Sequence, residues 1–142
     1  MAGPLMHTVT IEGDPAKIYE AISTGKGLAS FWTKDSRAQP KVGSIAKFGF
    51  GGPELELTVD ELKPGKLVRW TNPGGFPGWE GTTITWEIVP AKAGGQEVRF
   101  SHAGWPTAVP PEDLASVNYT WGRVVGRLKK HVESGDSVPY FP

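Results

Sequence analysis

One change of hydrophobic period, near residue 110, constrains this chain more than any other feature. Between Val42 and His102, apolar and polar residues alternate with a period of two, which predicts half-buried β-strands. From Leu114 to Val132 the apolar residues instead recur every three or four positions, which predicts an amphipathic helix of about six turns. We therefore expect an antiparallel sheet that is covered by one long C-terminal helix.

Glycine- and proline-rich turns divide the alternating region into five predicted strands. A further strand, from His7 to Ile11, alternates in the same way near the start of the chain. The expected fold class is α+β, with a curved six-stranded antiparallel sheet wrapped around the long helix. Charged residues on the outer face, such as Arg69, Arg99 and Glu54, are expected to form cross-strand pairs.

Two short helices are expected after the first strand. Asp14-Pro15 predicts a helix start, because Asp accepts a hydrogen bond at the N-cap and Pro suits the first helical position. Gly25 and Gly27 are expected to end this helix, and a second short helix or turn follows from Leu28 to Trp32. Pro110-Pro111 predicts the start of the long helix, and Gly135 predicts its end.

The composition narrows the class of protein. The 142 residues predict a single domain over 1–142, with its core at about 7–134 and a C-terminal tail at 135–142. With 15 acidic and 15 basic residues the formal net charge is zero, so a nucleic-acid partner is not expected. The chain has no cysteine, residues 1–7 show no signal-peptide pattern, and no apolar stretch reaches membrane-spanning length. We expect a cytoplasmic protein without a membrane span.

The inward faces of the predicted strands and helix define the candidate ligand-binding residues. A curved sheet and one helix leave space between them, which favours an apolar cavity; the alternative is that the same side chains close into an ordinary core. The candidate ligand-binding residues are Trp32, Phe48, Phe50, Trp70, Trp86, Phe100, His102, Trp105, Val117, Tyr119 and Trp121.

His102 is the one candidate catalytic residue. It ends an inward-facing row of side chains, and imidazole can exchange a proton near neutral pH, as a general acid or base requires. The alternative is a buried histidine that is hydrogen-bonded to a backbone carbonyl near Gly104. A carboxylate or Tyr hydroxyl beside an accessible His102 would favour catalysis.

Neither a metal nor a cofactor is expected. The chain has neither GxxxxGK[ST] nor GxGxxG, so its glycine clusters are interpreted as turns. His7, His102 and His131 are far apart in the sequence and lack HExxH spacing.

The C-terminal segment from Val138 to Pro142 is apolar and follows the predicted helix end. It either folds back over the sheet or docks onto a second copy of the chain, as in a homodimer.

An ordered set of short motifs, from His7 to Ser134, resembles the START-like superfamily, which includes Bet v-like and polyketide-cyclase proteins. Within it, the chain is most similar to the group named for the activator of the heat-shock protein 90 ATPase. The resemblance implies a helix-grip fold and a binding site for a lipid or small molecule; a minority of the superfamily are cyclases or hydrolases. The motifs are Phe31-Trp32, Gly43, Lys66-Leu67-Val68-Arg69-Trp70, Thr85-Trp86-Glu87-Ile88, Ser101-His102-Ala103-Gly104-Trp105, Trp121 and Leu128-Lys129.

Three hypotheses for the function follow. The first is a non-catalytic domain that holds an apolar or aromatic ligand between sheet and helix, with Gly25–Trp32 and Asn72–Glu80 at the opening. The second is a cyclase- or hydrolase-type enzyme that uses His102. The third is a module that interacts with heat-shock protein 90, which an exposed apolar patch of several hundred Å² would favour.

Overall fold

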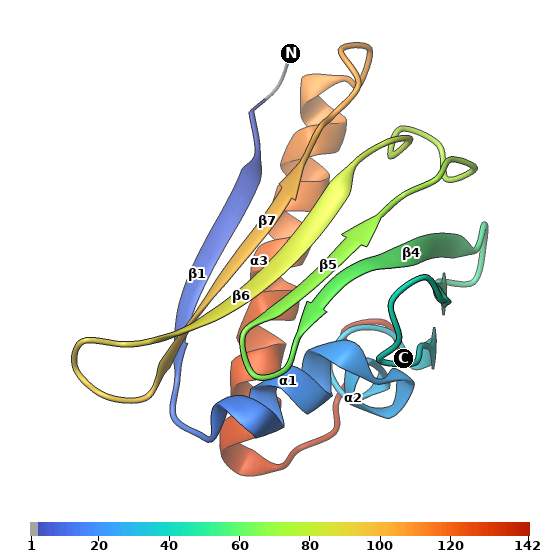
Figure 1. Cartoon of the computed structure of the whole chain (residues 1–142). Helices are drawn as coiled ribbons and strands as arrows, with labels where there is room; N and C mark the ends of the chain where they lie inside the picture. Colours follow the sequence, from blue (N-terminus) through green and yellow to red (C-terminus); the bar gives the residue numbers. More distant parts are fainter. Residues whose placement is uncertain (1–2) are drawn as a thin grey trace.

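The computed structural model describes residues 3–142, where one seven-stranded antiparallel sheet curves around a long helix (Figure 1). The expectation of no signal peptide falls partly on Met1 and Ala2, which lie outside the described residues. The strand order across the sheet is β1-β7-β6-β5-β4-β3-β2. The elements are β1 (Leu5–Ile11), α1 (Pro15–Ser23), α2 (Gly25–Ala29), β2 (Asp35–Arg37), β3 (Ile45–Gly49), β4 (Leu55–Lys63), β5 (Leu67–Thr71), β6 (Thr83–Pro90), β7 (Gln96–Ala103) and α3 (Pro111–Ser134).

The inner face of the sheet carries the apolar side chains that the alternation predicts. Trp86 on β6 is paired with Phe100 on β7, and Ile84 is paired with His102 in the same ladder. Because the side chains of a strand alternate between its two faces, all four of these side chains are buried against α3 while their neighbours in sequence turn outward. The expected α+β helix-grip fold is therefore confirmed.

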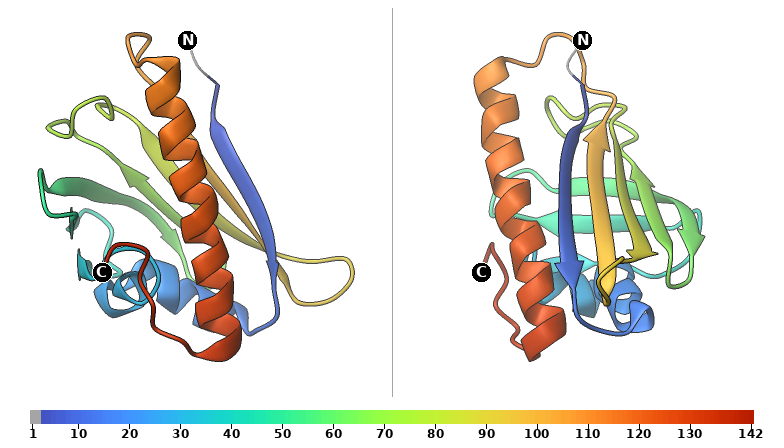
Figure 2. Two further views of the ribbon diagram at one scale, coloured as in Figure 1. Left: turned by 180° about the vertical axis from the view of Figure 1, so that it is seen from behind. Right: turned by 90° about the vertical axis from the view of Figure 1, so that its left-hand side faces the viewer.

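The helix α3 crosses the concave face of the sheet, as the two views in Figure 2 show. Its buried residues are Trp121, Val124, Val125 and Leu128, which recur at the predicted helical spacing. The helix begins with Pro111 at its first position and ends at Gly135, whose φ of 81° is a left-handed conformation that glycine adopts without strain.

The sheet has seven strands, where the sequence predicts six. The additional strand, β2, has three residues and pairs with the outer edge of β3 through Asp35, Ser36 and Arg37. A three-residue strand is too short to show a period, so the pattern could not reveal it. Its position is set by tertiary contacts, including the hydrogen bond that Thr33 Oγ1, just before the strand, donates to the carbonyl of Gly49 at 2.6 Å.

The expectation that Gly25 and Gly27 end the first helix is wrong. The helix α1 ends at Ser23, and both glycines belong to α2, which Thr24 caps by accepting a hydrogen bond from the Gly27 N–H at 3.0 Å. Gly27 lies directly on the backbone of α1, because a Cβ at this position would come within 2.5 Å of the Ala21 Cα. The glycine therefore permits a close approach of two helices.

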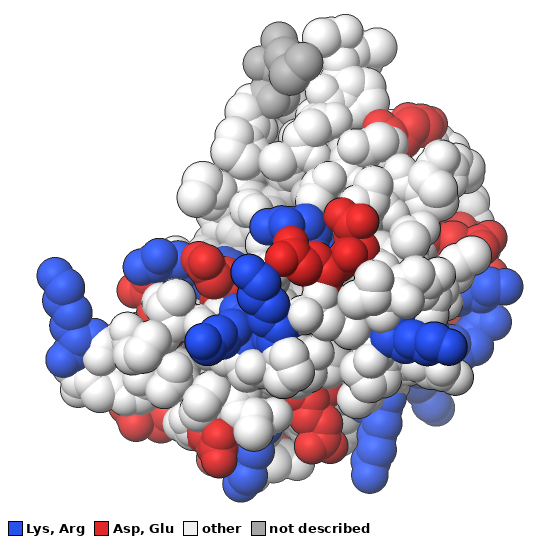
Figure 3. Space-filling model, in the orientation of Figure 1, with Lys and Arg blue, Asp and Glu red and all other residues white. Residues whose placement is uncertain are grey.

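The outer face of the sheet is charged and mixed in sign, as Figure 3 shows for the side seen in Figure 1. Arg99 pairs with Glu87 and Glu97, and Arg69 pairs with Glu61. The cross-strand pairs expected for Arg69 and Arg99 are thus present. They keep this face polar while the opposite face packs against α3.

Gly27 and Gly126 provide a matched test of this helix contact. Gly27→Ala is expected to destabilise the fold by about 1–3 kcal/mol, because its methyl group would overlap the backbone of α1. Gly126→Ala, which meets nothing within 4 Å on the exposed side of α3, is expected to stabilise by about 0.5–1 kcal/mol. Urea denaturation of both variants measures the difference; equal stabilisation by both would contradict the close contact.

Candidate functional site

A pocket of about 280 Å³ lies between the N-terminal half of α3 and the β3–β4 end of the sheet. Its wall combines five chain segments: the turn after α2, the β3–β4 turn, the β5–β6 loop, α3 and the C-terminal tail. We call it the aromatic pocket. Its lining residues are Trp32, Phe50, Gly52, Pro53, Phe76, Trp79, Ser116, Val117, Thr120, Trp121 and Phe141.

Five of these aromatic side chains form a closed circuit. Trp32 contacts Phe50 and Trp121, with ring centroids 5.7 and 5.0 Å apart. Phe76 contacts Phe50 at 6.4 Å and Trp79 at 5.1 Å, and Trp79 contacts Trp121 at 6.3 Å. Neighbouring rings are tilted by 36–67°, so they follow a curved wall instead of stacking flat. We call these five residues the aromatic ring.

A chain of hydrogen bonds runs behind the pocket and joins α3 to the sheet and the β5–β6 loop. The Trp121 Nε1–H donates to His102 Nδ1 at 3.1 Å, and His102 Nε2 bonds to Thr82 Oγ1 at 2.9 Å. Thr82 in turn donates to the carbonyl of Trp79 at 2.7 Å. Because an indole N–H can only donate, Nδ1 of His102 is the acceptor and its proton is on Nε2.

This arrangement holds His102 as a neutral imidazole. Its side chain is fully buried, and burial lowers the pKa of His102 to about 3, far below the ordinary 6.5. Its ring nitrogens bond to Thr82 and Trp121 rather than to a carboxylate or a Tyr hydroxyl. The geometry gives no support to acid–base catalysis by His102, because the residue is neither accessible nor tuned to exchange a proton near neutral pH. The expected bond to a carbonyl near Gly104 is replaced by these two side-chain partners.

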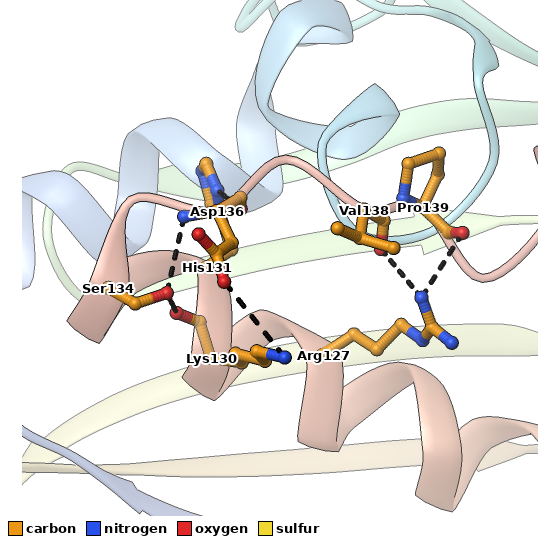
Figure 4. Close-up of polar contacts among 7 residues, drawn as sticks. All are labelled: Arg127, Lys130, His131, Ser134, Asp136, Val138 and Pro139. Atoms are coloured by element: carbon orange, nitrogen blue, oxygen red, sulfur yellow. Dashed lines mark hydrogen bonds and ion pairs between the residues drawn. The ribbon is translucent and has the colours of Figure 1, made fainter.

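The C-terminal tail completes the pocket. The N–H groups of Tyr140 and Phe141 donate to the carbonyls of Phe31 and Trp32, at 3.1 and 2.9 Å. Arg127 donates to the Val138 carbonyl at 2.9 Å (Figure 4). Its guanidinium group also lies 5.5 Å from the centre of the Tyr140 ring. The segment folds back onto its own chain, along residues 31–34 and α3 rather than over the sheet, and it brings Phe141 into the wall. Docking onto a second copy stays a prediction.

The structure separates the eleven predicted ligand-binding residues into three groups. Trp32, Phe50, Val117 and Trp121 line the pocket. Tyr119 is 65% exposed and lies outside it, because it projects from the solvent side of α3. The others are buried in the core behind the pocket wall: Phe48, Trp70, Trp86, Phe100, His102 and Trp105.

Three aromatic lining residues, Phe76, Trp79 and Phe141, are absent from the residues that the sequence singles out. Phe76 and Trp79 lie on the β5–β6 loop, part of which the sequence expects to border the opening. Their direction could not be derived, because a loop has no repeating pattern that assigns a side chain to a face. The presence of two large aromatic residues in a Gly/Pro-rich loop could have indicated that the loop contributes to a site, since loops commonly carry functional residues.

Neither a metal-binding cluster nor a membrane-spanning helix occurs within residues 3–142. No group of three or more His, Asp or Glu side chains in this range is placed to hold a metal ion. None of the helices in the same range combines the length and the apolar character needed to cross a membrane.

The family described as Activator of Hsp90 ATPase homolog 1-like protein matches residues 13–133 of the chain. None of the curated proteins matches it in sequence. Among solved structures, the Aha1 dimer from Colwellia psychrerythraea is 33% identical, with a TM-score of 0.84 over 95% of this chain and 98% of that one.

More distant structures share the fold alone. Protein MLL2253 from Mesorhizobium loti is 16% identical, with a TM-score of 0.77 over 89% of this chain and 94% of that one. DynU16, from the dynemicin biosynthetic locus, is 20% identical, with a TM-score of 0.78 over 99% of this chain and 51% of that one.

The buried neutral state of His102 predicts a pH dependence of stability. Because the folded pKa lies below the unfolded value of about 6.5, the unfolded state takes up a proton first, and stability is lost as pH falls below about 6.5. From pH 7 to pH 5 this group alone is expected to remove about 2 kcal/mol from the free energy of unfolding.

Urea denaturation at pH 7 and pH 5 measures the free energy of unfolding of the wild type and of His102→Gln. The free energy of the variant is expected to depend less on pH. His131→Gln, at an exposed edge of α3, is the control and is expected to follow the wild type. Should His102→Gln fail to fold, the titration midpoint of His102 can be measured directly from its imidazole NMR signal in the wild type. A His102 titration midpoint near 6.5 would contradict the buried neutral state.

The contacts between Arg127 and the tail predict that replacing Arg127 loosens the tail. Arg127→Met removes the hydrogen bonds to the carbonyls of Val138 and Pro139, so the tail is expected to open more often. Hydrogen exchange at the Tyr140 and Phe141 amides should accelerate about tenfold, as expected for the loss of one charged hydrogen bond. Lys130→Met, which removes only an exposed ion pair with Asp136 at 3.9 Å, is the control. Equal exchange in both variants would show that Arg127 does not hold the tail.

Proposed function

The chain belongs to the family of Activator of Hsp90 ATPase homolog 1-like proteins, and on that premise we propose that it is a binding protein for an apolar or aromatic small molecule. The observation that carries this proposal is the aromatic pocket, where six of the eleven lining residues are aromatic. Ligand pockets are typically concave, mostly apolar and equipped with a few polar groups, which Ser116 and Thr120 supply here.

The size of the pocket limits the ligand. A volume of about 280 Å³ is near the lower end of the range for small-molecule sites, about 300–1,000 Å³. This favours a compact aromatic compound over a long acyl chain. Binding is driven by burial of apolar surface, at about 25 cal/mol per Å², less the loss of translational freedom on association.

The two other hypotheses receive less support. Catalysis through His102 lacks an accessible imidazole. The exposed large apolar side chains that would favour a chaperone-binding patch are spread over four chain segments: Met6, Val42 with Ile45, Tyr119, and Val138. A dimer is known for the relative from Colwellia psychrerythraea, and for this chain it stays a prediction.

Val117 and Tyr119 provide a matched pair of variants on α3. Val117→Phe introduces a ring into the pocket and is expected to weaken binding of the neutral probe N-phenyl-1-naphthylamine at least tenfold, because the added volume competes with the ligand. Tyr119→Phe places the same side chain on the solvent side and is expected to bind as the wild type does.

Fluorescence titration of the probe measures both affinities, and thermal denaturation with and without the probe checks that binding stabilises the fold. Saturable binding that Val117→Phe weakens selectively supports the proposal. If the wild type shows no saturable binding of this probe or of the two smaller probes used below, the proposed function is wrong.

A further inference from the structure

We infer that the aromatic pocket selects an organic cation, whose quaternary or tertiary ammonium group lies inside the aromatic ring formed by Trp32, Phe50, Phe76, Trp79 and Trp121. This inference rests on the proposed function and adds the charge of the ligand to it. The closed circuit of aromatic contacts and the committed protons of Thr120 and Trp121 support it, and no charged lining residue opposes it.

The dimensions of the aromatic ring suit a cation. Neighbouring ring centroids are 5.0–6.4 Å apart, and all five rings line the same pocket. Five points evenly spaced around a circle at such separations lie about 5 Å from its centre, inside the limit of about 6 Å for cation–π attraction. A cation at the centre is therefore within range of several electron-rich rings at once, three of them from Trp, the strongest cation–π partner.

Two polar groups at the pocket, Thr120 and Trp121, have their protons committed to partners within the protein. The Thr120 hydroxyl donates its proton to the carbonyl of Ser116 at 3.0 Å, which leaves its oxygen lone pairs available. The Nε1–H of Trp121 is committed to His102 Nδ1 at 3.1 Å, so it cannot bind an anionic or carbonyl group. Lone pairs without a competing proton favour a positive ligand over a negative one.

The lining residues carry no charge that opposes a cation. The eleven lining residues, all within the described range 3–142, include no ionisable side chain. No Lys or Arg among them repels a cation, and no Asp or Glu attracts one, so selection falls to the aromatic rings. An alkylated ammonium group has few or no N–H bonds to leave unsatisfied, so its transfer from water to an apolar wall costs less than that of a primary ammonium.

Two isosteric probes test the charge directly. Phenyltrimethylammonium and tert-butylbenzene have the same shape and differ by one positive charge. In titrations that follow intrinsic tryptophan fluorescence, we expect the cation to bind at least tenfold more tightly than the neutral compound.

A matched pair of variants separates the charge effect from apolar contact. Phe76→Leu keeps an apolar side chain but removes one aromatic face, so affinity for phenyltrimethylammonium is expected to fall about three- to tenfold. Affinity for tert-butylbenzene is expected to change less than twofold. Tyr119→Leu removes an aromatic side chain outside the pocket and is expected to change neither affinity.

The outcomes distinguish this inference from the proposed function. Tighter binding of the cation, reduced selectively by Phe76→Leu, supports the inference. Equal or tighter binding of tert-butylbenzene overturns it and leaves the proposed function standing. If only N-phenyl-1-naphthylamine binds, the inference is likewise overturned and the proposed function stands. If none of the three probes binds, the proposed function fails, and the inference fails with it.

Discussion

The hydrogen bond from Trp121 to His102 is the contact on which the arrangement of this interior depends. It joins the middle of α3 to the last strand, and through Thr82 it reaches the loop that carries Trp79. A buried polar group that lacked a partner would cost about 1–3 kcal/mol, so each member of this chain constrains the next. This hydrogen-bonded chain fixes the rotamer of Trp121, the neutral state of His102 and the conformation at the base of the β5–β6 loop. Two of the five rings around the pocket are thereby held in position.

The space between sheet and helix is filled mainly by aromatic side chains. Trp86 lies 4.7 Å from Phe100 and 6.3 Å from Trp70, centroid to centroid, and all three are fully buried. Within residues 3–142 the Trp86 Nε1–H has no hydrogen-bond partner, a cost that the surrounding apolar contacts offset. Most of the space between sheet and helix is therefore closed into a core, and the aromatic pocket lies at one end of it. Protein interiors are close-packed, and side chains of this size leave little room elsewhere.

Family membership and site geometry contribute different parts of the functional argument. Membership in the Activator of Hsp90 ATPase homolog 1-like family accounts for the fold, and folds of this kind serve several functions. The ligand class is argued from the pocket itself, where rings from the turn after α2, the β3–β4 turn, the β5–β6 loop, α3 and the tail converge. Four of these five segments lie outside regular structure, so residues that shape the site can vary without disturbing the sheet.

The sequence alone determined the strands, the long helix and the face that each of them buries. These follow from local rules: the side chains of a strand alternate between two faces, and those of a helix return every 3.6 residues. Tertiary structure decided the rest. The three-residue strand β2, the partners of His102 and the placing of Phe76, Trp79 and Phe141 join segments far apart in the chain. The contact of Gly27 with α1 spans only a short stretch of chain, but it depends on how two neighbouring helices pack. No periodic pattern encodes such meetings, because they depend on where the completed sheet and helix leave space.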